Sequence, residues 1–195
     1  MKLVALLSDR ETPLGVAARH TTLRSERTNA ILAEPNGAAA KPESNPGVAL
    51  VWPDDPEVAA TEAALARCTR SVHRMREVVH WDELGAPGRG AVVLVYSVKR
   101  RADYSFDAFA EHYQQRHAPL ARIHHPGIAR YVQNFVTTPA DDAPFDAISE
   151  LWFASESDAR TRFYRDDESR RVIAEDVRRF IDLKRGGAFA ARVAG

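Results

Sequence analysis

The chain has 195 residues, 45% of them hydrophobic, and 27 basic side chains balance 27 acidic ones, so the basic excess typical of a nucleic-acid-binding protein is not visible. No run approaches the roughly 20 apolar residues that a membrane span needs. The single cysteine, Cys68, excludes an intrachain disulfide and a thiolate metal cluster and suits a reducing compartment, so we expect a cytoplasmic protein with neither nucleic acid nor membrane as a partner.

Residues 1–84 alternate short apolar runs with segments of helical character. The apolar runs predict strands at residues 3–7, 28–33, 48–52 and 71–81. Helices are predicted at residues 12–23 and 57–67. Gly15 and the Thr21-Thr22 pair weaken the first of these helices. A linker rich in glycine and proline follows at residues 85–90.

The same pattern restarts more strongly in residues 91–195. It predicts strands at residues 91–98, 128–136, 145–153 and 188–193, and helices at residues 106–120, 155–164 and 168–184. Each half therefore reads, coarsely, as β-α-β-β-α-β, which is a repeat of architecture. Two ferredoxin-like halves in one chain can pack sheet against sheet, as two separate subunits would. We accordingly predict an α+β fold.

The segment at residues 106–120 is the most informative stretch of the chain. Phe106, Phe109 and Tyr113 follow helical spacing and mark a buried stripe. His117 lies on the same stripe, four residues after Tyr113. Pro119 lacks an N–H, and its ring clashes with the carbonyl four residues back. We therefore expect the helix to kink or end near His117, beside a titratable ring.

The C-terminal half resembles the EthD domain, within the dimeric α/β barrel group. The resemblance covers roughly residues 90–193 and rests on four blocks: Phe109…His112-Tyr113…His117-Ala118-Pro119-Leu120, Pro126-Gly127…Tyr131-Val132-Gln133-Asn134, residues 145–153, and Asp176…Phe180. The N-terminal half lacks the His-Ala-Pro-Leu block, and Thr12-Pro13-Leu14 is its nearest echo, so it looks like a degenerate copy. The resemblance implies tandem ferredoxin-like halves that form an intramolecular dimeric α/β barrel, as a monomeric pseudo-dimer or a homodimer.

His117 is the strongest catalytic candidate. An imidazole on an apolar helix face can take or give a proton near neutral pH. The alternative is a buried histidine that bonds the backbone carbonyl freed by Pro119. Asp146 is the second candidate, because it could orient a histidine or accept a substrate proton. Its alternative is an ion pair with one of the many arginines.

Strand alternation puts Asp146, Ile148, Glu150 and Trp152 on one face of the strand at residues 145–153. A pocket for a flat hydrophobic substrate needs aromatic walls with a few polar groups. The residues that we predict to line it are Tyr113, Tyr131, Asn134, Glu150 and Trp152; the alternative is that the aromatic members are ordinary core residues.

The remaining histidines carry weaker signals. His112 lies about 140° round a regular helix from His117, so we expect it on the surface. His124 and His125 sit at a helix end and could form a cap or, with His117, a metal site, but no carboxylate stands at a familiar ligand spacing, so we predict no metal. His80 shows no pattern.

Members and relatives of the EthD group include cofactor-free monooxygenases, polyketide cyclases, dehydratases and lactone isomerases. The resemblance implies a small enzyme without a bound cofactor, a monooxygenase-type oxidoreductase acting on a hydrophobic phenolic or carbonyl compound by His-mediated proton transfer. A cyclase, dehydratase or lactone isomerase of the same fold is one alternative. A non-catalytic small-molecule-binding protein is another, and an interaction protein that uses the barrel only as a scaffold is a third.

Overall fold

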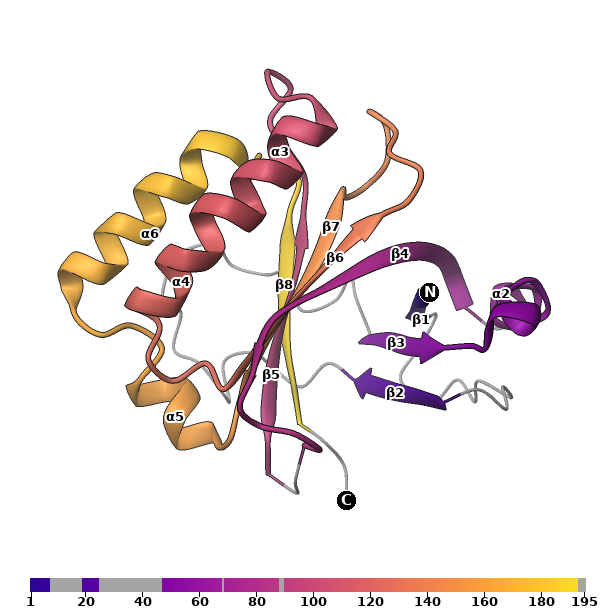
Figure 1. Cartoon of the computed structure of the whole chain (residues 1–195), viewed down its shortest axis with the longest axis horizontal. Coiled ribbons are helices and arrows are strands. Elements are labelled where there is room, and N and C mark those ends of the chain that lie inside the picture. Colours follow the sequence, from indigo (N-terminus) through magenta and orange to yellow (C-terminus); the bar gives the residue numbers. More distant parts are fainter. Residues whose placement is uncertain (8–18, 25–46, 68, 88–89, 193–195) are drawn as a thin grey trace.

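The computed structural model describes residues 1–7, 19–24, 47–67, 69–87 and 90–192, which form an α+β fold around one large antiparallel sheet (Figure 1). The N-terminal strands are β1 Lys2–Leu7, β2 Arg19–Arg24, β3 Gly47–Trp52 and β4 Thr69–Asp82. The C-terminal strands are β5 Val92–Val98, β6 Arg130–Val136, β7 Ala147–Phe153 and β8 Gly187–Arg192. The sheet is 8-stranded in the order β2-β3-β1-β4-β6-β7-β5-β8.

The two halves of the sheet share one internal order. Counted within its own half, each set of strands runs second, third, first, fourth. The halves join where β4 pairs with β6, from Met75 opposite Val136 to Asp82 opposite Arg130. Within the described residues, no ladder joins the edge strands β2 and β8, although some of their Cα atoms approach within 8 Å. The predicted closed barrel is therefore an open sheet here, because closure needs hydrogen-bond register along both edges.

The helices lie on one face of the sheet, which we call the helix face. They are α2 Val58–Ala66, preceded by a 3-10 turn at Asp55–Glu57, α3 Phe106–His112, α4 Ala118–His124, α5 Glu156–Thr161 and α6 Asp167–Phe180. In Figure 1, α4 and α6 lie side by side over the C-terminal strands. A π-helical segment, Tyr113–His117, links α3 directly to α4.

The opposite face of the sheet, the far face, is also buried. The curved sheet packs the far face of its N-terminal half against that of its C-terminal half, so that Val4 and Leu50 share one cluster with Val93, Ile148 and Trp152. Burial on both faces explains why β5 reads as a continuous apolar run. The far-face core holds the two halves together. Each Å² of apolar surface that it removes from water stabilises the fold by about 25 cal/mol.

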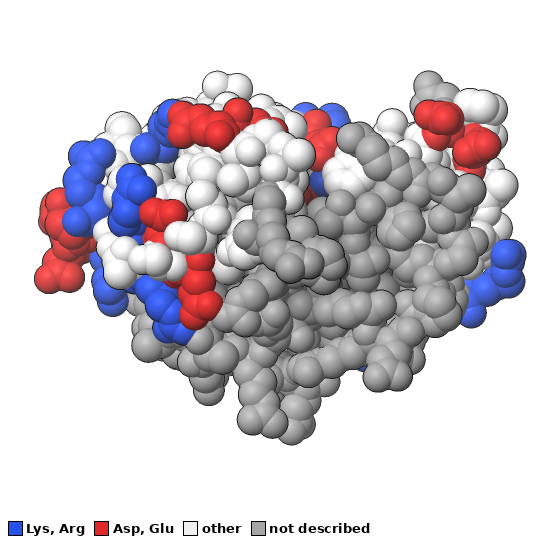
Figure 2. Space-filling model, turned by 90° about the horizontal axis from the view of Figure 1, so that it is seen from below, with Lys and Arg blue, Asp and Glu red and all other residues white. Residues whose placement is uncertain are grey.

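The surface is mixed in charge. On the part of the face in Figure 2 that is not grey, acidic and basic side chains are interspersed. Some oppositely charged side chains are neighbours on one helix: Arg171 bonds both Glu168 and Glu175 on α6. Exposed pairs of this kind contribute roughly 0.3–0.5 kcal/mol each.

Most predicted elements are confirmed, and the helices predicted at residues 57–67, 155–164 and 168–184 are shorter in the structure. The predicted helix at residues 12–23 is wrong over residues 19–23, which belong to β2 and pair with β3. The β-branched pair Thr21-Thr22 favours a strand once a partner edge is present. The predicted strand at residues 28–33 lies outside the described residues. The last helix ends at Phe180, because Ile181 is extended and forms a bridge with Arg100.

The helix predicted to kink or end near His117 instead runs on to His124. The π segment absorbs the irregularity, since the N–H of Ala118 bonds the carbonyl of Tyr113, five residues back. Pro119 then falls in the first turn of α4, where a missing N–H costs little. The helical chain therefore continues past Pro119, and the register of the side chains changes by one residue.

Candidate functional site

His117 meets a carboxylate on the neighbouring helix. Its Nδ1 lies 2.9 Å from Oδ2 of Asp176, and both side chains are buried. Asp176 projects from the stripe of α6 that also buries Ile173 and Phe180. The predicted alternative, in which His117 bonds a backbone carbonyl freed by Pro119, is not what the structure shows.

The same carboxylate also binds His112. Nε2 of His112 lies 2.9 Å from Oδ1 of Asp176, and the ring stacks on Phe180 with a centroid distance of 4.4 Å. Our expectation of a surface position for His112 is therefore wrong. The expected separation of about 140° holds for a regular helix, whereas the i→i+5 segment brings residues 112 and 117 to the same side.

The two histidines keep Asp176 charged. Burial alone would raise the pKa of Asp176, but the hydrogen bonds and charges of His117 and His112 outweigh burial and hold the pKa below its usual value. An ionised carboxylate only accepts hydrogen bonds, so His117 donates from Nδ1. In the neutral ring, Nε2 is then the basic nitrogen. It has no hydrogen-bond partner among the residues that the structure describes.

Two tyrosines and a glutamine lie beneath this helix pair. The Tyr113 hydroxyl lies 2.7 Å from the Ser149 hydroxyl, and the Tyr113 and His117 ring centroids are 5.1 Å apart. Nε2 of Gln133 donates to the Tyr131 hydroxyl at 2.9 Å and to the Tyr113 carbonyl at 3.1 Å. Burial raises the pKa of both tyrosines, so each keeps its proton at neutral pH.

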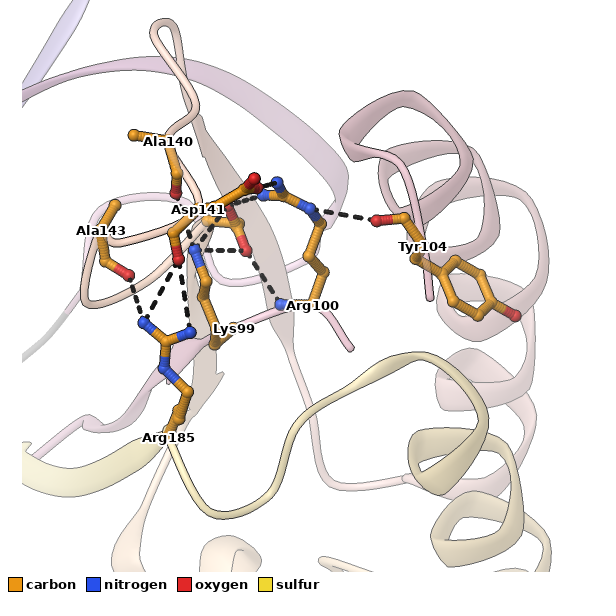
Figure 3. A network of polar contacts seen from close by, with 8 residues as sticks. Lys99, Arg100, Tyr104, Ala140, Asp141, Ala143 and Arg185 are labelled. Carbon is orange, nitrogen blue, oxygen red and sulfur yellow. Dashed lines mark hydrogen bonds and ion pairs between the residues drawn. The ribbon is translucent and has the colours of Figure 1, made fainter. Parts of the chain in front are cut away.

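Asp146 does not contact His117. Its carboxylate accepts from the Arg100 backbone N–H at 2.9 Å, pairs with the Arg100 guanidinium, and lies 3.3 Å from Nζ of Lys99. Figure 3 shows the surrounding network, in which Arg100 also pairs with Asp141 and Arg185 bonds the Asp141 carbonyl. The alternative stated for Asp146 in the sequence analysis, an ion pair with an arginine, is therefore what the structure shows. This pair anchors the loop between β6 and β7.

The other predicted pocket residues lie on the far face. Glu150 accepts from Nδ2 of Asn134 at 2.7 Å and from Nε1 of Trp152 at 3.1 Å. Nζ of Lys2 completes this buried network, 2.6 Å from Glu150 and 2.8 Å from Glu77. The sheet thus separates these residues from His117, Tyr113 and Tyr131, so the seven predicted residues do not line one pocket.

Sequence reasoning missed Asp176 as the partner of His117. The available signal was a carboxylate on an otherwise apolar stripe, since Asp176 lies three residues after Ile173 and four before Phe180. It also missed Lys2, whose position in a short apolar strand predicts burial but no partner.

Residues 101–184 match the family model described as the EthD domain. The match thus lies within the C-terminal half of the chain. His112, His117, Asp146 and Asp176 all lie inside the matched range. The resemblance noted from the sequence is thereby confirmed for this part of the chain.

The fold has a relative among solved structures. The crystal structure of an anthrone oxidase-like protein superimposes with a TM-score of 0.58 and 13% identity, over 100% of this chain and 90% of that one. At this identity, the similarity shows a shared fold around the EthD domain. No curated protein matches the chain.

Two further properties concern only the described residues. No helix there has the length and hydrophobicity to cross a membrane. No three His, Cys, Asp or Glu side chains are grouped there to hold a metal ion. At Asp176, one ring nitrogen of His112 and one of His117 bond the carboxylate directly.

Proposed function

We propose that this protein is a small oxidoreductase of the monooxygenase type, which needs no bound cofactor and acts on a hydrophobic phenolic or carbonyl compound. The observation that carries the proposal is the contact between Nδ1 of His117 and Asp176. A histidine whose Nδ1–H is held by a buried carboxylate presents a basic Nε2 and is stabilised once it is protonated.

The chemistry needs one proton transfer and molecular oxygen. Nε2 of His117 removes a proton from a CH₂ carbon of the substrate. That carbon is activated by the adjacent aromatic ring and by the phenolic or carbonyl group. The resulting carbanion reduces oxygen, so that a CH₂ group and O₂ give a C=O group and water. Asp176 balances the charge of the imidazolium. General base catalysis of this kind contributes about 10²–10⁴ in rate.

The substrate class rests on the comparisons. A solved relative described as anthrone oxidase-like favours a flat aromatic substrate. Tyr113 supplies an aromatic ring beside His117, and Gln133 links Tyr113 to the Tyr131 hydroxyl. Asp146 takes no part in this proton transfer, because Lys99 and Arg100 occupy its carboxylate.

We propose further that the chain is a monomeric pseudo-dimer built from two ferredoxin-like halves, residues 1–84 and 91–195. The shared strand order of the two halves and the packing of their far faces support this arrangement. Light scattering coupled to gel filtration is expected to give the mass of one chain. A mass of two chains would favour the homodimer instead.

The test of function is oxygen uptake with an anthrone as substrate. We expect His117→Gln to lower the rate at least 100-fold while the far-ultraviolet circular dichroism stays unchanged. His124→Gln is the matched control, because His124 lies on α4 and bonds Ser169 instead of Asp176. Wild-type turnover by His117→Gln would exclude the general base role.

The alternatives give different results in the same experiment. A cyclase, dehydratase or lactone isomerase would consume no oxygen but would still need His117 for proton transfer. A binding protein would hold the anthrone without turning it over, and His117→Gln would leave that binding intact.

A further inference from the structure

His112 and His117 approach one carboxylate from the same stretch of helix, five residues apart. The π-helical segment that ends at His117 changes the helical register, so both rings point toward α6. Nε2 of His112 lies 2.9 Å from Oδ1 of Asp176, and Nδ1 of His117 lies 2.9 Å from Oδ2. The two oxygens of Asp176 are therefore divided between two rings.

The ring of His112 is held by its faces as well as by its N–H. It stacks on Phe180 with a centroid distance of 4.4 Å and an interplanar angle of 30°. The ring of Tyr104 meets it edge-on at 6.2 Å. Phe180 follows Asp176 by four residues, so the two share one stripe of α6. The His112 ring can leave Asp176 only by giving up these contacts as well.

The contact with His112 restricts what Asp176 can offer to His117. A carboxylate that is bonded through one oxygen only can rotate about its Cβ–Cγ bond and exchange its two oxygens, because that torsion is soft. Donation from His112 to Oδ1 removes this freedom and leaves Oδ2 facing His117. A fixed, ionised acceptor in turn keeps the proton of the neutral His117 ring on Nδ1.

Burial is the largest single effect on the pKa of Asp176 and raises it, but the hydrogen bonds and charges of His117 and His112 together lower it further than burial raises it. His112 thus helps to keep the carboxylate ionised. An ionised Asp176 is what the imidazolium of His117 needs as a counter-charge.

We propose that His112 is a positioning residue for His117: it fixes the Asp176 carboxylate, which fixes the orientation and the tautomer of the base. This assignment rests on the proposed function, because it takes His117 as the general base. The packing supports these roles, since His112 is stacked on Phe180 whereas His117 lies tilted at 5.5 Å from the same ring. A ring locked by packing is suited to hold another group in place.

The first measurement is oxygen uptake with an anthrone, over a range of substrate concentrations. His112→Phe keeps a ring against Phe180 but removes the N–H. We expect kcat to fall about tenfold with KM unchanged, the effect of one hydrogen bond to a charged group. His112→Gln retains an N–H donor and is expected to restore kcat to within about threefold of wild type. His124→Phe is the matched control, because His124 bonds Ser169 instead of Asp176.

Two kinetic results would overturn the proposal. Wild-type turnover in His112→Phe would show that Asp176 needs no second donor. A loss in His112→Gln as large as that in His117→Gln would make His112 an acid or base itself, because glutamine donates an N–H but takes up no proton. If His112→Phe does not fold, His112→Ala takes its place, since alanine suits a helix and also removes the donor.

A second readout needs no substrate. Nitrogen nuclear magnetic resonance of the histidine rings distinguishes protonation at Nδ1 from protonation at Nε2. At a pH where the ring is neutral, we expect His117 to carry its proton on Nδ1 in the wild type and in His112→Gln, and to be a mixture of both tautomers in His112→Phe. An unchanged tautomer in His112→Phe would contradict the positioning role.

The two readouts separate this inference from the proposed function. If the tautomer of His117 depends on His112 but the wild type oxidises no anthrone, the proposed function fails and the positioning of His117 by His112 stands. Oxidation that depends on His117, with neither turnover nor tautomer sensitive to His112, would refute the positioning role alone.

Discussion

Nδ1 of His117 and Oδ2 of Asp176 lie 2.9 Å apart, although the two residues are 59 positions apart in the sequence and belong to different helices. The second oxygen of the same carboxylate holds His112. One buried carboxylate thus orients two imidazoles on the helix face.

Replacing Asp176 with Asn should impair turnover more than it impairs folding. The amide can still face one ring, but it carries no charge to stabilise the imidazolium and can present a donor to Nδ1. We expect the rate of oxygen uptake to fall roughly 10–100-fold. Asp167→Asn on the exposed first turn of α6 is the matched control. An unchanged rate in Asp176→Asn would remove the carboxylate from the mechanism.

The depressed pKa of Asp176 predicts a pH dependence of stability. The folded pKa lies below the unfolded value of about 3.9, so the unfolded state binds more protons in between. The contribution is complete above about pH 4 and is lost as the pH falls through the folded pKa. Urea denaturation of wild type and Asp176→Asn should therefore show a gap at pH 6 that narrows below pH 4. A constant gap would contradict this reasoning.

His125 predicts a dependence in a different pH range. Burial lowers its pKa to about 4, against the raising effect of the hydrogen bond with the Phe163 carbonyl. The unfolded state takes up a proton near pH 6.5, so the free energy of unfolding falls as the pH drops from 6.5 to 4. The loss is of the order of 3 kcal/mol, from 1.36 kcal/mol for each pKa unit. His125→Gln should flatten this slope in urea titrations, and an unchanged slope would exclude His125 as its source.

The far-face network should matter for stability and not for turnover. Glu150→Ala removes the acceptor of Trp152 and one of the two acceptors of Lys2 and of Asn134. Loss of one partner from a buried ion pair typically costs about 3–5 kcal/mol. We expect a loss toward the lower end, because Glu77 still holds Lys2. Thermal unfolding measures the loss, and a comparable loss of activity in the folded variant would place this network in the site after all.

Most of the fold follows from local patterns. Alternation along β7 correctly placed Ile148, Glu150 and Trp152 on one face. Helical spacing correctly placed His117 on a buried stripe. The misassigned stretch at residues 19–23 shows the limit, because the strand there depends on pairing with β3, which local propensity does not encode.

The sequence by itself determined that the protein carries an EthD-like half and that His117 is buried beside aromatic rings, because both follow from local periodicity and short motifs. Only the tertiary structure decided the partners. The π segment turned His112 toward Asp176, which a regular helix would not do. The sheet separated Glu150 from His117, and the β4–β6 pairing brought His80 to Tyr131. These contacts join residues far apart along the chain, so they depend on packing and register, which no short window of sequence contains.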